Sequence, residues 1–161
     1  MTVAVGDRLP DANLLLMTSE GPKTVSLKEK LDGRKVVLFA VPGAYSNTCD
    51  VAHMPSFIRT KDAFAAKGVD EIICVAVNDP FVLKRWSEST GADKAGIACL
   101  SDGDGSFARA IGQSFDAEAV GFYGRSRRYA MYVEDGVVKV FHPETTRGCE
   151  TSSGEALLDA I

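Results

Sequence analysis

A single thiol, Cys49, stands in the stretch VPGAYSNTCDVAHMPSF (41–57), where an apolar run ends and a helical pattern begins. A cysteine in the first turn of a helix feels the partial positive charge of unpaired backbone N–H groups, which stabilises thiolate over thiol. The carboxyl end of a buried strand is also where α/β sheets form binding crevices. Both arguments favour a reactive thiolate. Cysteine is also common as a small buried hydrophobe, however, so position alone leaves both interpretations open.

Length and charge narrow the class of protein. The 161 residues fit one domain spanning 1–161, which is long enough to close a core without disulfides or metals. Because 18 Lys and Arg stand against 22 Asp and Glu, nucleic acid and anionic membranes are not indicated as partners. No apolar run approaches the roughly 20 residues of a membrane span, and the N-terminal stretch does not resemble a signal peptide. We therefore expect a cytoplasmic protein, or an organellar one if a transit peptide was removed.

Strand and helix patterns alternate along the chain. Buried strands are predicted at 35–41 and 71–77, where nearly every residue is apolar, and a helix is predicted at 49–67 with a kink at Pro55. Capping boxes at Ser26 and Ser152 predict a helix that ends near Gly33 and a C-terminal helix. A third helix is predicted to be capped within Asn78-Asp79-Pro80 and to run to about Ser89. The other predicted elements are a strand at 97–100, a short helix to Ile111, and a hairpin of 129–133 and 137–141. This order predicts an α/β fold with a mixed central sheet flanked by helices.

His53 follows Cys49 by four residues and therefore shares its helical face. It could be the general base of a Cys–His pair or half of a metal site, but no third orienting group or metal ligand lies at a suggestive spacing. A structural, hydrogen-bonded histidine is the favoured interpretation. The four cysteines include no CxxC pair, which disfavours zinc knuckles and dithiol motifs of that type. No cofactor or metal is expected.

The pattern of Pro42, Ser46 and Cys49 resembles the active-site loop of the peroxiredoxins, P-x-x-x-T/S-x-x-C. The finer similarity is to the type II, atypical two-cysteine subfamily, through VPGAYSNTCDVAHMPSF, GVDEIICVAVNDPFVLKRW and GRSRRYAMYVEDGVVK. The resemblance covers most of the chain. It implies a thioredoxin-like fold, and reduction of hydrogen peroxide and organic hydroperoxides by the cysteine itself, without metal or haem.

The resemblance also assigns roles, residue by residue. It gives the peroxidatic position to Cys49, the Thr/Ser position to Ser46, the loop proline to Pro42 and the arginine before YAMYV to Arg128. A Cys49 thiolate would attack the terminal oxygen of a hydroperoxide and become a sulfenic acid. Ser46 is expected to donate to the peroxide while accepting from backbone, Arg128 to stabilise thiolate and oxyanion, and Pro42 to shield the thiolate from water. From the residues alone, Arg128 could not be chosen over the other two arginines of GRSRR, which could equally be a solvated basic turn.

A second thiol has to condense with the sulfenic acid. Cys74 lies 25 residues beyond Cys49, the spacing of plant-like type II enzymes, but mid-strand it equally suits an ordinary core cysteine. The start of the Cys49 helix would have to unwind before these two sulfurs could meet. Cys149 is the rival resolving residue, because another branch uses a cysteine near the C-terminus, but it equally suits an exposed loop thiol. Cys99 is interpreted as core. If neither serves, glutathione or glutaredoxin would reduce the sulfenic acid directly.

The resulting hypothesis is a thiol-dependent peroxidase with a hydroperoxide substrate, recycled by thioredoxin or by glutaredoxin with glutathione. A homodimer is implied by the resemblance, with Phe81 and Trp86 of VNDPFVLKRW as a candidate interface, although aromatic residues at helical spacing more often belong to a core. One alternative is a redox-sensing binding or chaperone-like module that uses the same cysteine. Another is a structural thioredoxin-like domain whose thiols are inert.

Overall fold

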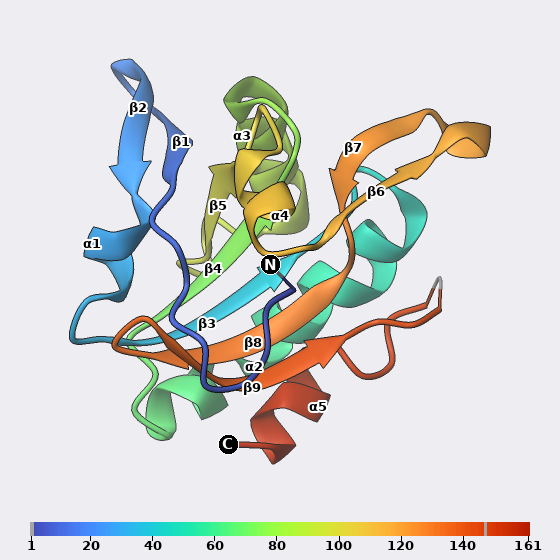
Figure 1. Ribbon diagram of the computed structural model, residues 1–161. Coiled ribbons are helices and arrows are strands. Elements are labelled where there is room, and N and C mark those ends of the chain that lie inside the picture. The colour runs from blue at the N-terminus through green and yellow to red at the C-terminus, as the bar shows by residue number, and fades with distance from the viewer. Residues whose placement is uncertain (1, 147) are drawn as a thin grey trace.

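The structure, a computed structural model, describes residues 2–146 and 148–161, and the side chain of Cys49 lies outside this description. Within the described part, seven strands form one mixed sheet in the order β2-β1-β5-β4-β3-β8-β9, and two more form a separate arm (Figure 1). The strands are β1 (Asn13–Thr18), β2 (Gly21–Ser26), β3 (Lys35–Ala40), β4 (Glu71–Ala76), β5 (Ala98–Ser101), β6 (Ser114–Ala117), β7 (Phe122–Ser126), β8 (Tyr129–Glu134) and β9 (Val137–Pro143).

Helices connect and cover these strands. The α-helices are α1 (Leu27–Leu31), α2 (Met54–Ala66), α3 (Pro80–Thr90), α4 (Ser106–Ala110) and α5 (Gly154–Asp159). A π-helical turn, Cys49–His53, leads directly into α2, and a single 3₁₀ turn, Glu118–Val120, closes the tip of the arm. Strands β3, β4 and β5 are parallel to one another, whereas β8 is antiparallel to β3.

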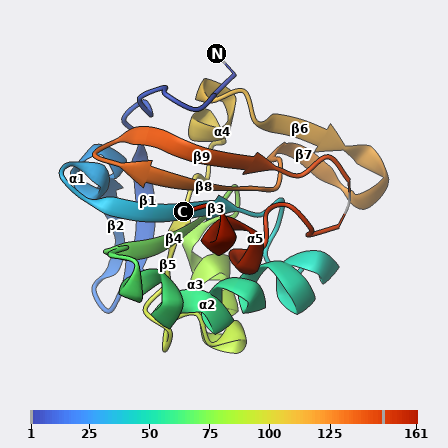
Figure 2. The same ribbon diagram turned by 90° about the horizontal axis from the view of Figure 1, so that it is seen from below.

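The sheet is buried on both faces. Figure 2 places α2, α3 and α5 on one side, and α4 with the N-terminal segment on the other. Alternate residues of β3 therefore enter two different cores, with Phe39 packed beneath α2 and Leu38 facing α4. Burial on both faces explains why β3 and β4 are apolar at nearly every position, since neither face meets water.

Local sequence signals predicted several elements correctly. Asp79 caps α3 by accepting from the backbone N–H of Val82 at 2.9 Å, and Pro80 is its first residue. The hairpin between β8 and β9 turns at Asp135 and Gly136, whose φ angles of 48° and 78° match the left-handed pair that a type I′ turn requires. The mixed sheet with helices on both faces is confirmed.

Three expectations need correction. The predicted helix 49–67 is not one kinked helix, because a π-helical turn precedes α2 and Pro55 lies in the first turn of α2. Proline supplies no N–H for a regular i→i−4 bond, which agrees with an α-helix that starts at this point. The cap of α5 is Ser153, which accepts from the N–H of Ala156 at 3.1 Å, rather than Ser152. Strands β1, β2, β6 and β7 were not predicted.

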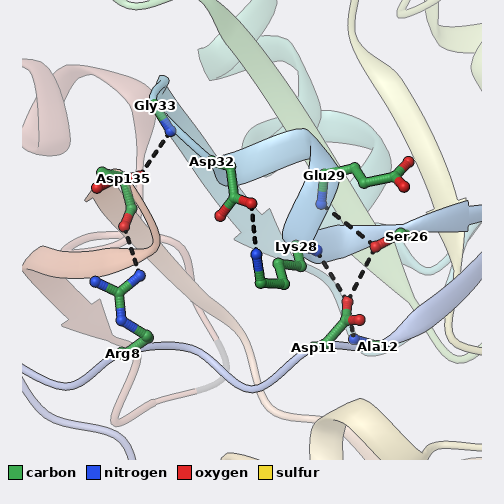
Figure 3. Close-up of polar contacts among 9 residues, drawn as sticks. All are labelled: Arg8, Asp11, Ala12, Ser26, Lys28, Glu29, Asp32, Gly33 and Asp135. Carbon is green, nitrogen blue, oxygen red and sulfur yellow. Dashed lines mark hydrogen bonds and ion pairs between the residues drawn. The ribbon is translucent and has the colours of Figure 1, made fainter.

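Polar contacts join α1 to the N-terminal segment (Figure 3), and α1 lies at the end of the sheet opposite the arm (Figure 1). Ser26 caps α1 as predicted, by accepting a backbone N–H at 3.3 Å, and its hydroxyl donates to Asp11 at 3.2 Å. The carboxylate of Asp135 accepts from the N–H of Gly33 at 2.7 Å, while its carbonyl accepts from Arg8 at 2.8 Å. The β8–β9 turn is thus tied to both neighbouring segments.

Helix α5 approaches α2 closely at one glycine. The N–H of Gly154 donates to the hydroxyl of Ser56 at 2.8 Å, and a Cβ on Gly154 would lie 2.5 Å from the backbone oxygen of Ser56. Because that oxygen belongs to the backbone of α2, it cannot rotate away. Glycine is therefore required here for the packing of α5, and this packing fixes the loop that precedes α5.

We predict that Gly154→Ala lowers the free energy of unfolding by about 2 kcal/mol through overpacking. Urea denaturation followed by circular dichroism measures this change. Gly148→Ala is the matched control, since its Cβ would meet only an ordinary contact, the Thr146 hydroxyl at 3.6 Å. Equal midpoints for the two variants would contradict the packing argument.

Candidate active site

A cavity of about 560 Å³ lies at the end of the sheet where the loop after β3, the arm and the loop after β9 come together (Figure 1 and Figure 2). Pro42, Ser46 and Arg128, three of the predicted site residues, all line it. These residues are more than 80 positions apart in sequence at their extremes, so the fold brings them together. Apolar residues of the arm form the rest of one wall: Phe115, Ala117, Ala119, Val120 and Phe122.

The backbone places Cys49 at the first position of the π-helical turn that precedes α2. The loop that leads to it leaves the carboxyl end of β3, and the N–H of Asp50 already donates to the carbonyl of Ser46 at 3.1 Å. The expected backbone setting, a cysteine in a first helical turn after a buried strand, is therefore present. Because the Cys49 side chain lies outside the described part, its reactivity stays a prediction.

The loop between β3 and the turn is fixed by its own polar groups. The Ser46 hydroxyl donates to the carbonyl of Gly43 at 2.7 Å, and the N–H of Ala44 donates to the side chain of Asn78 at 2.9 Å. Ser46 was expected to give its proton to a peroxide, but here that proton is given to backbone. Its oxygen can instead accept, which changes the role we assign to it below.

The three arginines of GRSRR have different surroundings. Arg125 donates to the carbonyl of Pro42 at 3.0 Å and lies over the ring of Phe122, while Arg127 is exposed and lies over the ring of Phe115. Arg127 and Arg128 both line the cavity, and Arg128 alone among the three is buried, at 8% exposure. The burial of Arg128 distinguishes it from its neighbours, and its catalytic role stays a prediction.

His53 holds the guanidinium of Arg128. Its Nε2 lies 2.9 Å from the carbonyl of Ser152, which can only accept, so Nε2 carries the proton. Its Nδ1 is then a lone-pair acceptor for Arg128 Nη1–H at 2.9 Å. Burial, together with the Arg128 charge, lowers the pKa of His53 to about 3, although the bond to Ser152 opposes this shift. The favoured interpretation, a buried structural histidine, agrees with this geometry.

Glu144, which was not singled out in the sequence, organises the loop before α5. Its carboxylate accepts from the Ser152 hydroxyl at 2.7 Å, from the Ser152 N–H at 3.1 Å and from the Glu150 N–H at 3.0 Å. Burial would raise the pKa of Glu144, but these hydrogen bonds together hold it below its usual value. Glu144 follows β9 directly, so only its place in the fold reveals the role: it sets Ser152, which orients His53.

The remaining thiols lie in different environments. Cys74 is 1% exposed in the middle of β4 and pairs in register with Phe39 of β3. Cys149 is half-buried in the loop before α5, with its sulfur 3.8 Å from the Ser152 hydroxyl, and burial raises the pKa of its thiol. Cys99, on β5, belongs to the core as expected.

Phe81 and Trp86, the candidate interface pair, differ in exposure. Phe81 is 65% exposed at the start of α3, whereas Trp86 is fully buried, and its indole N–H donates to the carboxylate of Asp50. The expectation that Trp86 contributes to an interface is therefore wrong. It joins α3 to the turn that begins at Cys49.

Comparisons with known proteins agree on one family. The model of the redoxin family matches residues 4–158. The chain is 48% identical over 164 residues to chloroplastic peroxiredoxin-2E-2 of Oryza sativa subsp. japonica, covering 99% of this chain and 73% of that protein. It is 37% identical over 160 residues to peroxiredoxin-2B of Arabidopsis thaliana, covering 99% of this chain and 98% of that protein. This chain belongs to the type II peroxiredoxins.

A solved peroxiredoxin has the same architecture. Reduced Prx3 of Vibrio vulnificus in complex with H2O2 matches this peroxiredoxin with a TM-score of 0.92 and 44% identity, over 99% of both chains. The thioredoxin-like fold and the thiol peroxidase activity implied by the resemblance are confirmed. In residues 2–146 and 148–161, no helix is long and apolar enough to cross a membrane, and no group of three or more His, Cys, Asp or Glu is placed to hold a metal ion.

We predict that the buried neutral His53 makes stability fall in acid. His53 binds a proton near pH 6.5 in the unfolded chain and near pH 3 in the folded protein. Its contribution to the free energy of unfolding is therefore complete above pH 6.5 and is lost as pH falls toward 3. The free energy of unfolding should change by at most about 1.4 kcal/mol per pH unit because of this residue. Urea midpoints between pH 7 and pH 5 measure it.

His53→Asn is the comparison variant, because asparagine keeps an acceptor for Arg128 and does not titrate. The wild-type curve should fall more steeply than the variant curve over this interval, before most carboxylates titrate. Parallel curves would contradict the assignment of a neutral His53.

Proposed function

We propose that this peroxiredoxin reduces hydrogen peroxide and organic hydroperoxides through a sulfenic acid on Cys49. The observation that carries the proposal is Arg128, a buried guanidinium held by His53 at the cavity beside the turn that begins at Cys49. A cation fixed in advance at this place stabilises a thiolate. It also stabilises the negative charge that develops on the leaving oxygen.

The proposed first step is a displacement on oxygen. The Cys49 thiolate attacks the terminal oxygen of ROOH, an S–O bond forms, the O–O bond breaks, and RO⁻ leaves and takes up a proton. Cysteine is oxidised to a sulfenic acid and the hydroperoxide is reduced to an alcohol, or to water when R is hydrogen. Pro42, which has no N–H, helps to keep water from the thiolate.

Ser46 is assigned a receiving role in this step. Because its own proton is given to the carbonyl of Gly43, its oxygen accepts the O–H of the hydroperoxide and orients the terminal oxygen toward Cys49. Threonine has the same hydroxyl and can make the same two hydrogen bonds, so Ser46→Thr is compatible with this role.

The cavity favours hydroperoxides that carry an apolar group. Its volume of about 560 Å³ is far larger than hydrogen peroxide, and the arm lines it with Phe115, Val120 and Phe122. An alkyl or aryl group can leave water by packing on this wall, which adds binding energy to organic hydroperoxides alone.

We predict that Val120→Glu lowers kcat/KM for cumene hydroperoxide about tenfold, because an apolar contact is replaced by a charge. The value for hydrogen peroxide should stay unchanged. Tyr123→Glu is the matched control, since Tyr123 lies on the same arm and is as exposed, at 64% against 65% for Val120, but does not line the cavity. An equal loss of kcat/KM for both substrates, or for cumene hydroperoxide in both variants, would show that the arm does not bind the apolar group of the hydroperoxide.

We assign the resolving role to Cys74. It is the register neighbour of Phe39, whose ring stacks on Phe57 of α2 at 4.1 Å and lies 5.0 Å from the ring of His53. Cys74 is thus one strand away from the side chains that lie beneath the Cys49 turn. That turn is π-helical instead of α-helical, and we propose that it opens locally, after which Cys74 condenses with the sulfenic acid and releases water.

Cys149 stays the rival for the resolving role. It is half-buried in the loop before α5, where burial raises the pKa of its thiol. For the final reduction we propose a dithiol donor, thioredoxin or glutaredoxin with glutathione. We retain the cytoplasm as the proposed compartment, with an organelle as the alternative because the rice relative is chloroplastic.

We also propose a homodimer, formed through an apolar patch of Tyr45, Val51 and Phe81. These side chains are 50%, 69% and 65% exposed. Their segments adjoin, because Asn78, just before α3, binds the loop of Tyr45, and α3 binds the turn of Val51 through Trp86. Exposed apolar patches often mark sites of protein–protein contact, and a second copy of the chain would remove these side chains from water.

We predict that Phe81→Asp converts the dimer to a monomer in sedimentation velocity. Val5→Asp is the control, since Val5 is also exposed, at 61%, but lies in the N-terminal segment away from the patch. A dimer that persists in Phe81→Asp, or a wild-type protein that sediments as a monomer, would contradict this interface.

The proposed cycle is tested by steady-state turnover with excess dithiothreitol. Wild-type protein should consume many equivalents of peroxide per chain, and Cys49→Ser should lose this activity entirely. A redox-sensing binding module would instead consume about one equivalent and stop. Activity that survives in Cys49→Ser would remove Cys49 from the reaction.

A further inference from the structure

Two thiols outside the cavity lie side by side in the sheet. Cys74 on β4 and Cys99 on β5 are register partners on neighbouring parallel strands, and both belong to the core that faces α2 and α3. Neighbouring strands are about 4.8 Å apart, which falls within the Cα separation of about 4.4–6.8 Å that disulfides span. The backbone therefore already holds these two thiols at a distance that a disulfide can bridge.

The two thiols differ in their access to the surface. Cys74 lies between β3 and β5, whereas Cys99 lines a groove of about 350 Å³ between α3 and β1. The groove exists because, within the described residues, β1 pairs with β5 at Leu15 and Ser101 alone. Beside Cys99 the outer edge of β5 is therefore left without a paired strand.

The order of the strands gives Cys99 a role after the sulfenic acid is resolved. A Cys49–Cys74 disulfide, formed as proposed above, joins Cys74 to a segment that leaves the end of β3, on one side of β4. Cys99 is on the other side of β4. A thiol held this close to a disulfide sulfur attacks it with a high effective concentration.

We propose that Cys99 takes over the disulfide from Cys49, leaving a Cys74–Cys99 bond within the sheet. In this step the Cys99 sulfur attacks the Cys74 sulfur, the Cys74–Cys99 bond forms and the Cys49–Cys74 bond breaks. Cys49 leaves as a thiolate with the bonding electron pair, and the proton of Cys99 passes to solvent. One disulfide replaces another, so the step needs no further oxidant or reductant.

The transfer changes what the protein can do before a reductant arrives. Cys49 is again a thiolate and can reduce a second hydroperoxide while the first oxidising equivalent is stored in the sheet. Cys99, which is 6% exposed, is the sulfur of the stored disulfide that borders the groove lined by Leu16 and Lys84, and local opening of this groove would let an external thiol reach it. This inference rests on the proposed cycle, and it adds a second thiol pair to that cycle.

The test uses reduced full-length protein carrying Cys149→Ser, which removes the rival resolving thiol, with and without Cys99→Ala. Each protein receives one equivalent of hydrogen peroxide without reductant, is quenched in acid and alkylated, and is mapped by peptide mass spectrometry. We expect the Cys74–Cys99 peptide with alkylated Cys49 in the first protein. In the double variant we expect the Cys49–Cys74 peptide instead.

A second equivalent of peroxide provides an independent measurement, the number of equivalents that each protein consumes without reductant. The protein with Cys99 should consume two equivalents per chain, the second giving a sulfenic acid on Cys49 that dimedone traps, whereas the double variant should consume one. Consumption of that one equivalent also demonstrates that the double variant is folded and active.

Two outcomes overturn the transfer but leave the reaction of Cys49 with peroxide standing. A Cys49–Cys74 peptide that accumulates while Cys99 stays alkylated overturns the transfer alone. A Cys49 sulfenic acid with both Cys74 and Cys99 alkylated overturns the transfer and the resolving role of Cys74. A protein that consumes no peroxide, with all thiols alkylated, overturns the proposed cycle itself and the transfer with it.

Discussion

The site depends on a buried positive charge held by an imidazole that stays neutral. Removing a guanidinium from water costs several kcal/mol unless hydrogen bonds replace the lost hydration. His53 supplies one for Arg128, and it can accept only because its other nitrogen donates to Ser152. A protonated His53 would repel the arginine. Burial and the neighbouring positive charge both act against that protonation, so the arrangement reinforces itself.

The same chain of contacts joins segments that are distant in sequence. Arg128 precedes β8, His53 ends the turn before α2, and Ser152 belongs to the loop that Glu144 organises. Glycine at 154 lets α5 pack against α2 so that this loop is held in place. The helix packing thus supports the end of the molecule that holds the cavity, and a π-helical turn followed by Pro55 in the first turn of α2 connects the loop after β3 to this packing.

A sheet buried on both faces explains where the chemistry can occur. Its central strands offer no polar groups to solvent, so the groups that meet the hydroperoxide lie on loops beyond the strand ends, whereas the thiols proposed to act afterwards, on β4 and β5, are enclosed in the core. The two enclosed thiols differ in how near they lie to the surface, because their strands differ in how fully they pair with neighbouring strands. The strand that carries Cys74 has a neighbour on each side, and the one that carries Cys99 lies next to a groove.

The sequence by itself determined the features that rest on local physics. Apolar runs fixed β3 and β4, Asp79 and Pro80 fixed the start of α3, and Asp135-Gly136 fixed the hairpin, because each depends on a few adjacent residues. The pattern of Pro42, Ser46 and Cys49 could be matched to the family for the same reason, since these residues lie within eight positions of one another.

Only the tertiary structure decided what depends on distant partners. It buried Arg128 alone among three arginines, revealed the contacts of Glu144, moved the cap of α5 to Ser153 and buried Trp86. The hairpin of β1 and β2 and the arm went unpredicted because short strands are stable only through their pairing and packing. Hydrogen bonds and burial between segments far apart in the chain are set by the fold, and no local pattern records them.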